Sequence, residues 1–176
     1  MANKVAAPGR VLRSSGLVML GVCLMSVPSL CRAANNCAWI NEATASGLLG
    51  GDAVGVVTGA AGEQPATCTF TQLGGEGTRT LRVTVEIAAD AHVRFGEIAQ
   101  ICGVKGIPLT AIGNEALVCA ADESKRRISE RVVGRVRDQV FTITISTTLK
   151  NDPILTRDAL KDRMYTAAEQ VAGNLF

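Results

Sequence analysis

Apolar and polar residues alternate strictly along two segments of the chain, which is the pattern of a strand with one buried and one wet face. In residues 79–88, Leu81, Val83, Val85 and Ile87 alternate with Thr80, Arg82, Thr84 and Glu86. In residues 140–147, Phe141, Ile143 and Ile145 alternate with Thr142, Thr144 and Ser146. Both segments therefore predict strands of an antiparallel sheet whose second face is polar.

Neighbouring segments complete this predicted sheet. Residues 67–72 pair with 79–88 through the glycine-rich turn at 74–77, and residues 127–137 pair with 140–147 through a tight turn at Asp138-Gln139. A short strand at 116–121 contains Cys119, and the glycine-rich stretch 50–62 has room for one more at 53–57.

Three segments have helical spacing. Asn41 caps a short helix that ends at Gly50-Gly51, Asp90 caps one over 89–101, and Thr156 caps a closing helix. The closing helix has an apolar stripe of Leu160, Met164, Ala167, Ala168, Val171 and Leu175. We expect an α+β fold with an antiparallel sheet of about five strands and two or three helices packed on one face.

The first 33 residues have the organisation of a signal peptide. Lys4, Arg10 and Arg13 precede an uncharged run from 16 to 30, which is shorter than a membrane-spanning helix. Small residues favour cleavage before Ala34, and a cut after Cys31 competes with it. Two alternatives are a lipid anchor on Cys31, which the bulky Leu30 disfavours, and a retained signal anchor, which the short run disfavours.

The predicted product is one secreted or periplasmic domain, residues 34–176. The leader carries Lys4, Arg10, Arg13 and Arg32 but none of the 16 acidic residues, so the remaining domain is weakly acidic. Nucleic-acid binding would need a strong positive charge. Aromatic residues make up only 3% of the chain, which leaves few stacking surfaces for sugars or bases.

Four cysteines remain once the leader is removed, and an even number in an exported chain indicates two disulfides. Three pairings are possible. We favour Cys37 with Cys68 and Cys102 with Cys119, because each pair joins neighbouring segments. A metal site is disfavoured because no Cys-x-x-Cys occurs and His92 is the single histidine.

The strand at 127–137 carries an unusual number of arginines. Period-two geometry places Arg127, Arg131, Arg135 and Arg137 along one side, and Arg82 of another strand can join them. Such a row suits an anionic wall polymer, a lipid headgroup or an acidic partner protein. We favour the other interpretation of this row, a solvated face whose arginines pair with Glu86 and other acids across strands.

The sequence contains few residues or motifs that indicate catalysis. His92 reads as a surface histidine, Asp122-Glu123 as the charged entry to a hairpin, and no Gly-x-Ser-x-Gly is present. We therefore predict no enzyme and no cofactor, and keep an extracytoplasmic hydrolase as the alternative. An apolar cleft between sheet and helices is a further candidate site for a small ligand.

The order of motifs resembles that of small secreted or lipid-anchored bacterial domains of unknown function. The likeness lies in Cys37-Ala38-Trp39, Gly47-Leu48-Leu49-Gly50, Cys68-Thr69-Phe70, the turn at 112–116 and the hairpin at 135–141. A more distant similarity is to extracytoplasmic sensor domains of bacterial kinases.

This resemblance implies an extracytoplasmic binding or accessory domain without established catalytic residues, and it also favours the Cys37–Cys68 pairing. The resemblance supplies no ligand, and the partners left open are an envelope protein, an anionic polymer or a small apolar ligand. A structural or inhibitory protein that offers its sheet to another protein is the remaining alternative.

Overall fold

The computed structural model describes residues 36–59, 64–122 and 128–176, with the side chain of Asp122 left out. The predicted signal peptide, Glu123 and Arg127 lie outside the described residues. None of the helices in the described ranges has the length and apolar character needed to cross a bilayer.

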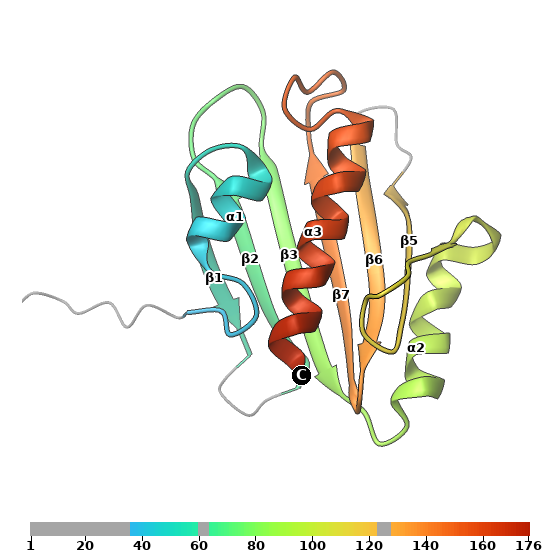
Figure 1. Cartoon of the computed structure of the whole chain (residues 1–176). Helices are drawn as coiled ribbons and strands as arrows, with labels where there is room; N and C mark the ends of the chain where they lie inside the picture. The colour runs from blue at the N-terminus through green and yellow to red at the C-terminus, as the bar shows by residue number, and fades with distance from the viewer. Residues whose placement is uncertain (1–35, 60–63, 123–127) are drawn as a thin grey trace, which may run out of the picture. The chain divides into compact units, whose positions relative to one another are not determined.

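The fold is α+β, as predicted, and is built on a single antiparallel sheet (Figure 1). The strands are β1 (Ala53–Thr58), β2 (Ala66–Gln72), β3 (Arg79–Ile87), β4 (Ile107–Pro108), β5 (Glu115–Asp122), β6 (Ile128–Val136) and β7 (Gln139–Thr147). Their order across the sheet is β1-β2-β3-β7-β6-β5-β4. The predicted count of about five strands is therefore too low, because β1 and the two-residue β4 extend the sheet at its two edges.

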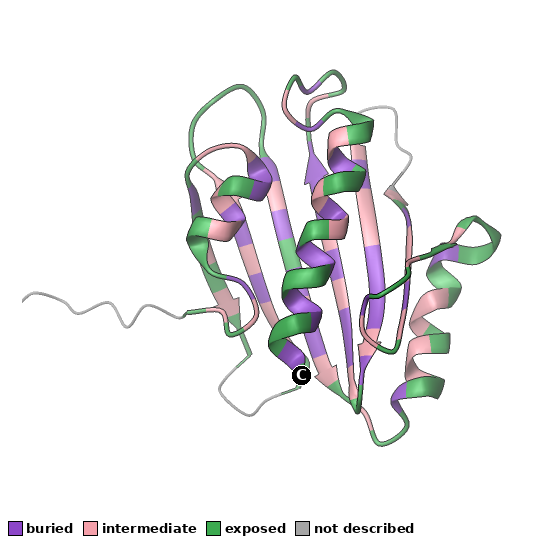
Figure 2. Ribbon diagram, in the orientation of Figure 1, coloured by how far each residue is buried: buried purple, intermediate pink, exposed green. Residues whose placement is uncertain are grey.

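Alternation of side chains gives the sheet two different faces. Leu81, Val83 and Val85 of β3 are fully buried, and they lie opposite Ile145, Ile143 and Phe141 of β7 in the strand register. Buried and more exposed residues alternate along these strands (Figure 2). We call this buried side the core face and the other side the outer face.

Two helices cover the core face (Figure 1). Helix α1 (Glu42–Leu49) begins after Asn41, whose side chain accepts from the Thr44 backbone N–H at 2.8 Å. Helix α3 (Arg157–Leu175) begins after Thr156 in the same way and buries the predicted apolar stripe against β6 and β7. Both predicted caps satisfy backbone donors that the first helical turn leaves free.

Helix α2 (Ala91–Ala99) packs on the outer face, so the prediction that all helices share one face is wrong. Its Phe95 and Ile98 pack with Val133, which points away from the core face because its neighbour Val132 points into it. Beyond α2, the chain continues as a 3₁₀-helix, η1 (Gln100–Lys105).

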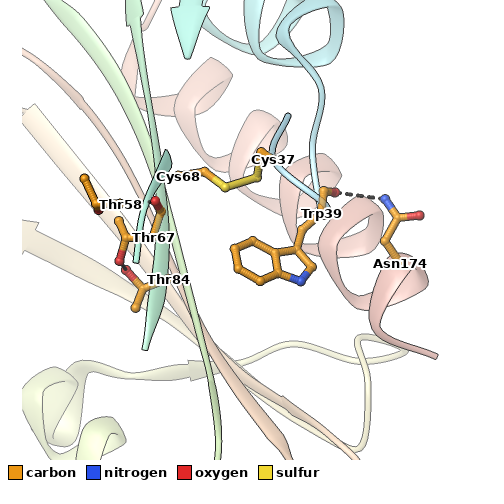
Figure 3. The surroundings of a disulfide bond; sticks show 7 residues. All are labelled: Cys37, Trp39, Thr58, Thr67, Cys68, Thr84 and Asn174. Atoms are coloured by element: carbon orange, nitrogen blue, oxygen red, sulfur yellow. Dashed lines mark hydrogen bonds between the residues drawn. A yellow bond between two sulfur atoms is a disulfide. The ribbon is translucent and has the colours of Figure 1, made fainter. Parts of the chain in front are cut away.

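The structure contains both disulfides with the predicted pairing, Cys37–Cys68 and Cys102–Cys119. The first joins the segment before α1 to the centre of β2, beside the Trp39 side chain (Figure 3). The Asn174 side chain of α3 donates to the Trp39 carbonyl at 2.8 Å and so ties the closing helix to this segment. The second disulfide joins η1 to β5 and anchors the outer-face helix.

The hairpin between β6 and β7 turns one residue earlier than predicted, at Arg137-Asp138. Arg137 has a φ of 55°, in the left-handed region that tight hairpin turns require. This conformation removes Arg137 from the alternation of β6.

Candidate anion-binding site

The end of the outer face that α2 leaves open forms a polar hollow of about 350 Å³. We call it the outer hollow. Its lining combines hydroxyl groups with two arginines, and consists of Thr69, Thr80, Arg82, Ala121, Ser129, Arg131, Thr144 and Ser146.

Strand register explains why residues far apart in the sequence meet in this hollow. Arg82 of β3 and Arg131 of β6 both lie directly opposite Thr144 of β7, one on each side. Adjacent strands are about 4.8 Å apart, so the two arginine backbones are separated by roughly 10 Å. Two long guanidinium side chains at that spacing can reach one anionic group held above Thr144.

The next row of the sheet supplies hydroxyl groups. Thr80, Ser146 and Ser129 lie opposite one another on β3, β7 and β6. Thr80 and Ser146 share a hydrogen bond of 2.7 Å, in which either oxygen can be the donor. Only one hydroxyl hydrogen of the two is used in that bond, so the other can be donated to a ligand.

Neither arginine of the outer hollow has a carboxylate partner within the described ranges. Among the residues that the structure describes, the side chains of Arg82 and Arg131 form no hydrogen bond and no ion pair, although Arg131 is partly buried. The Arg131 Nε atom is completely shielded from solvent and lacks an acceptor. A buried guanidinium N–H without an acceptor is costly, and an oxyanion in the hollow would remove that cost.

The other arginines of the predicted row are engaged elsewhere. Arg135 donates from Nε and Nη2 to Glu115 Oε1, at 2.9 and 2.6 Å. Burial by itself would raise the pKa of Glu115, but hydrogen bonds from His92 and Arg135 hold it below its ordinary value. Arg137 lies at the turn with its guanidinium 5.6 Å from the centre of the Phe176 ring.

The continuous row therefore does not form among the described residues. Arg135 follows the alternation of β6 but is neutralised by a carboxylate of β5, and Arg137 is turned away by its backbone conformation. Arg127 lies outside the described residues. Arg131 is therefore the member of the predicted row that lines the outer hollow, and Arg82 of β3 lies beside it there, as predicted.

His92 is an exposed residue near the start of α2. Its Nδ1 lies 2.8 Å from Glu115 Oε1, and its side chain is 72% exposed. No serine, threonine or cysteine is hydrogen-bonded to it within the described part of the chain. The side chains of the Asp122-Glu123 pair are not among those described.

Metal binding has no obvious donor set. Within residues 36–59, 64–122 and 128–176, no three His, Cys, Asp or Glu side chains gather in a group able to hold a metal ion.

The hydroxyl residues of the hollow were not singled out from the sequence, although a signal was present. Thr69, Thr144 and Ser146 occupy the polar phase of alternating strands, where hydroxyl residues replace the usual charged ones. Strand order was needed to place them beside Arg82 and Arg131.

Comparison of the chain with protein-family models, with curated proteins and with solved structures gives no match.

Proposed function

We propose that this domain is a non-enzymatic binding or accessory protein of the bacterial cell envelope that holds an anionic ligand in the outer hollow. The observation that carries the proposal is the presence of two arginines, Arg82 and Arg131, in a hollow lined by hydroxyl groups, where no described carboxylate pairs with them.

Comparison with other arginines of the domain supports this assignment. Arg79, Arg94 and Arg135 each bind a carboxylate, on Asp152, Glu86 and Glu115 respectively. In the outer hollow, hydroxyl groups take the place of the acidic residues. A site with this composition attracts an oxyanion from solution instead of neutralising itself.

The ligand class follows from the donors. Guanidinium groups and hydroxyls suit a phosphoryl, sulfate or carboxylate group with several exposed oxygens. The described lining contains no aromatic side chain that could stack against a sugar ring. An anionic group on an envelope polymer or a lipid headgroup fits these donors.

The two disulfides support an extracytoplasmic location, because such bonds persist in oxidising compartments. The predicted leader over residues 1–33 supports the same location. The described lining of the outer hollow contains no His, Asp, Glu or Cys that could act as a general base, which supports binding over hydrolysis.

The experiment is a titration of the oxidised domain with pyrophosphate, followed by NMR signals of the arginine Nε–H groups. We expect saturable shifts of the Arg82 and Arg131 signals. Arg82→Gln and Arg131→Gln should each weaken binding by about tenfold or more, which corresponds to one lost charge-assisted hydrogen bond.

Arg137→Gln is the matched control, because it removes the same charge from an exposed turn outside the hollow. It should leave the affinity within about twofold, as expected for a screened surface charge. Equal loss of affinity in all three variants would indicate non-specific attraction and would contradict the proposal, as would the absence of saturable shifts.

A further inference from the structure

A second cavity, of about 650 Å³, lies at the edge of the sheet where strand β5 extends beyond the end of the much shorter β4. Strand β4 pairs with Leu117 and Val118, so the outer edge of β5 from Cys119 onward has no strand beside it among the described residues. The space next to this edge is enclosed by η1, β4 and the first half of α3. We call it the edge cavity.

The walls of the edge cavity are largely apolar. They include Ile101, Ile107, Leu109, Val118, Tyr165 and the Cys102–Cys119 disulfide. Ile101 and Ile107 are 64% and 60% exposed, so a molecule that entered the cavity would cover apolar surface that now faces water. Cavities of roughly 300–1,000 Å³ with such walls are typical of small-ligand sites.

Two carboxylate residues of the described chain line this cavity, the exposed Asp162 of α3 and the partly buried Glu130 of β6. Glu130 of β6 lies on the core side of its strand, opposite Ala120 of β5, and lines the cavity. It is only partly exposed and has no hydrogen-bond or ion-pair partner among the described residues. Burial raises the pKa of Glu130, although the charges of Lys161 and Arg157 partly oppose this effect.

A lysine of α3 shares this lining with Glu130. Lys161 of α3 also lines the cavity, but its side chain is exposed and forms no ion pair with Glu130. A hydrated ammonium gains little from an added partner, whereas a half-desolvated carboxylate gains more from one.

We propose that the edge cavity binds a small amphiphilic amine, whose apolar body lies against Ile107, Val118 and Tyr165 and whose ammonium group pairs with Glu130. Charge complementarity decides the ligand class, because Glu130 is a partly buried carboxylate beside these apolar walls and has no ion-pair partner in the described part of the chain, whereas Asp162 of the same lining is exposed to water. This site is independent of the outer hollow, which has arginines in place of the glutamate and shares only Ala121 with it.

The test uses octylamine below its micellar concentration, with octanol and octanoate as matched probes of equal chain length. Binding is followed by NMR of isotope-labelled Ile, Leu and Val methyl groups in the oxidised domain. We expect saturable shifts at Ile101, Ile107, Leu109 and Val118 with octylamine. Octanol and octanoate should bind about tenfold more weakly or worse, since neither forms the ion pair.

Glu130→Gln removes the charge with little change of shape and breaks no ion pair among the described residues, so this variant should fold. It should bind octylamine at least about tenfold more weakly. Glu169→Gln, on an exposed turn of α3 outside the cavity lining, is the control and should bind like the unaltered protein.

A second variant, Ala120→Trp, places a large ring at the cavity wall and should abolish the methyl shifts. The proposal is overturned if octanoate binds as tightly as octylamine, if Glu130→Gln keeps full affinity, or if the shifted methyl groups lie outside the edge cavity. Arg82→Gln and Arg131→Gln should leave octylamine binding unchanged, so failure here is separable from failure at the outer hollow.

Discussion

Arg79 and Asp152 form a buried, bidentate ion pair, although they are 73 residues apart in the sequence. Arg79 Nε donates to Asp152 Oδ2 at 2.6 Å, and Nη2 donates to Oδ1 at 2.8 Å. The carboxylate also accepts from the Thr147 hydroxyl and from the backbone N–H groups of Ile154 and Leu155. The pair thus fastens the segment before α3 to the start of β3.

Breaking this ion pair should strongly destabilise the domain. Asp152→Asn removes the negative charge that balances Arg79. The Arg79 side chain is only 6% exposed, so its charge would remain buried without a counter-ion. We expect the free energy of unfolding to fall by about 3–5 kcal/mol. Urea unfolding of the oxidised domain measures this change. Asp138→Asn, at an exposed turn, should change stability by less than about 0.5 kcal/mol, and a similar small effect of Asp152→Asn would contradict the assignment.

The same carboxylate predicts acid sensitivity. Burial alone would raise the pKa of Asp152, but hydrogen bonds from Arg79, Leu155, Thr147 and Ile154 outweigh burial and hold the pKa well below its ordinary range. A carboxyl with a lowered folded-state pKa stabilises the fold above its unfolded value of about 3.9 and loses that contribution below it. The stability gap between the unaltered protein and Asp152→Asn should therefore narrow from pH 6 to pH 2. A gap that stays constant would refute this reading.

The contribution of Glu130 to the stability of the domain should depend on pH in the opposite sense. Burial raises its pKa, and a raised folded-state pKa means that stability is lost as pH rises from the unfolded value of about 4.3 through the folded one. Glu130→Gln should therefore raise the melting temperature at pH 7, by about 1–2 °C. The difference should vanish near pH 3.5, where the carboxyl is protonated in both states. Melting curves over this pH range give the answer without any ligand.

Removal of either disulfide should destabilise the domain through the entropy of the unfolded chain. The sequence separations are 31 residues for Cys37–Cys68 and 17 for Cys102–Cys119. On the chain-entropy account, the paired alanine variants lose about 3.7 and 3.1 kcal/mol respectively. Denaturant unfolding of both double variants measures the losses. A larger loss at the shorter loop would show that native packing around η1 outweighs chain entropy.

Gly134 should tolerate no side chain. It lies in β6 directly opposite Phe141, and a Cβ at this position would collide with the Phe141 ring. Gly134→Val should lower stability by about 2–3 kcal/mol, a typical cost of overpacking. Gly96→Ala is a useful comparison, because a Cβ there meets nothing within 4 Å and the residue lies inside α2. It should raise stability by about 0.5–1 kcal/mol, as measured in the same urea titrations.

Much of the local structure follows from short-range patterns. The alternation at Leu81, Val83 and Val85 predicted which side chains of β3 are buried, because side chains of a strand point to opposite faces in turn. The caps at Asn41 and Thr156 were equally predictable, since each cap acts within three residues of itself.

Other features could not be predicted in this way. Strand β4 is only two residues long and carries no periodic signal, so the sequence predicted neither this strand nor the position of the cavity beside it, although an apolar cleft between sheet and helices was expected. The face covered by α2 depends on how the chain crosses from β3, which local pattern does not encode. Neutralisation of Arg135 also required knowledge that Glu115 lies on the adjacent strand.

The sequence by itself determined the α+β class, the buried side of the main strands and the preferred cysteine pairing, because these depend on periods of two or four residues and on neighbouring segments. Only the tertiary structure decided that Arg82 and Arg131 flank Thr144 and that Glu130 faces an apolar cavity. These arrangements depend on the order of strands across the sheet. That order is set by the packing of the whole core, so no local stretch of residues reveals it.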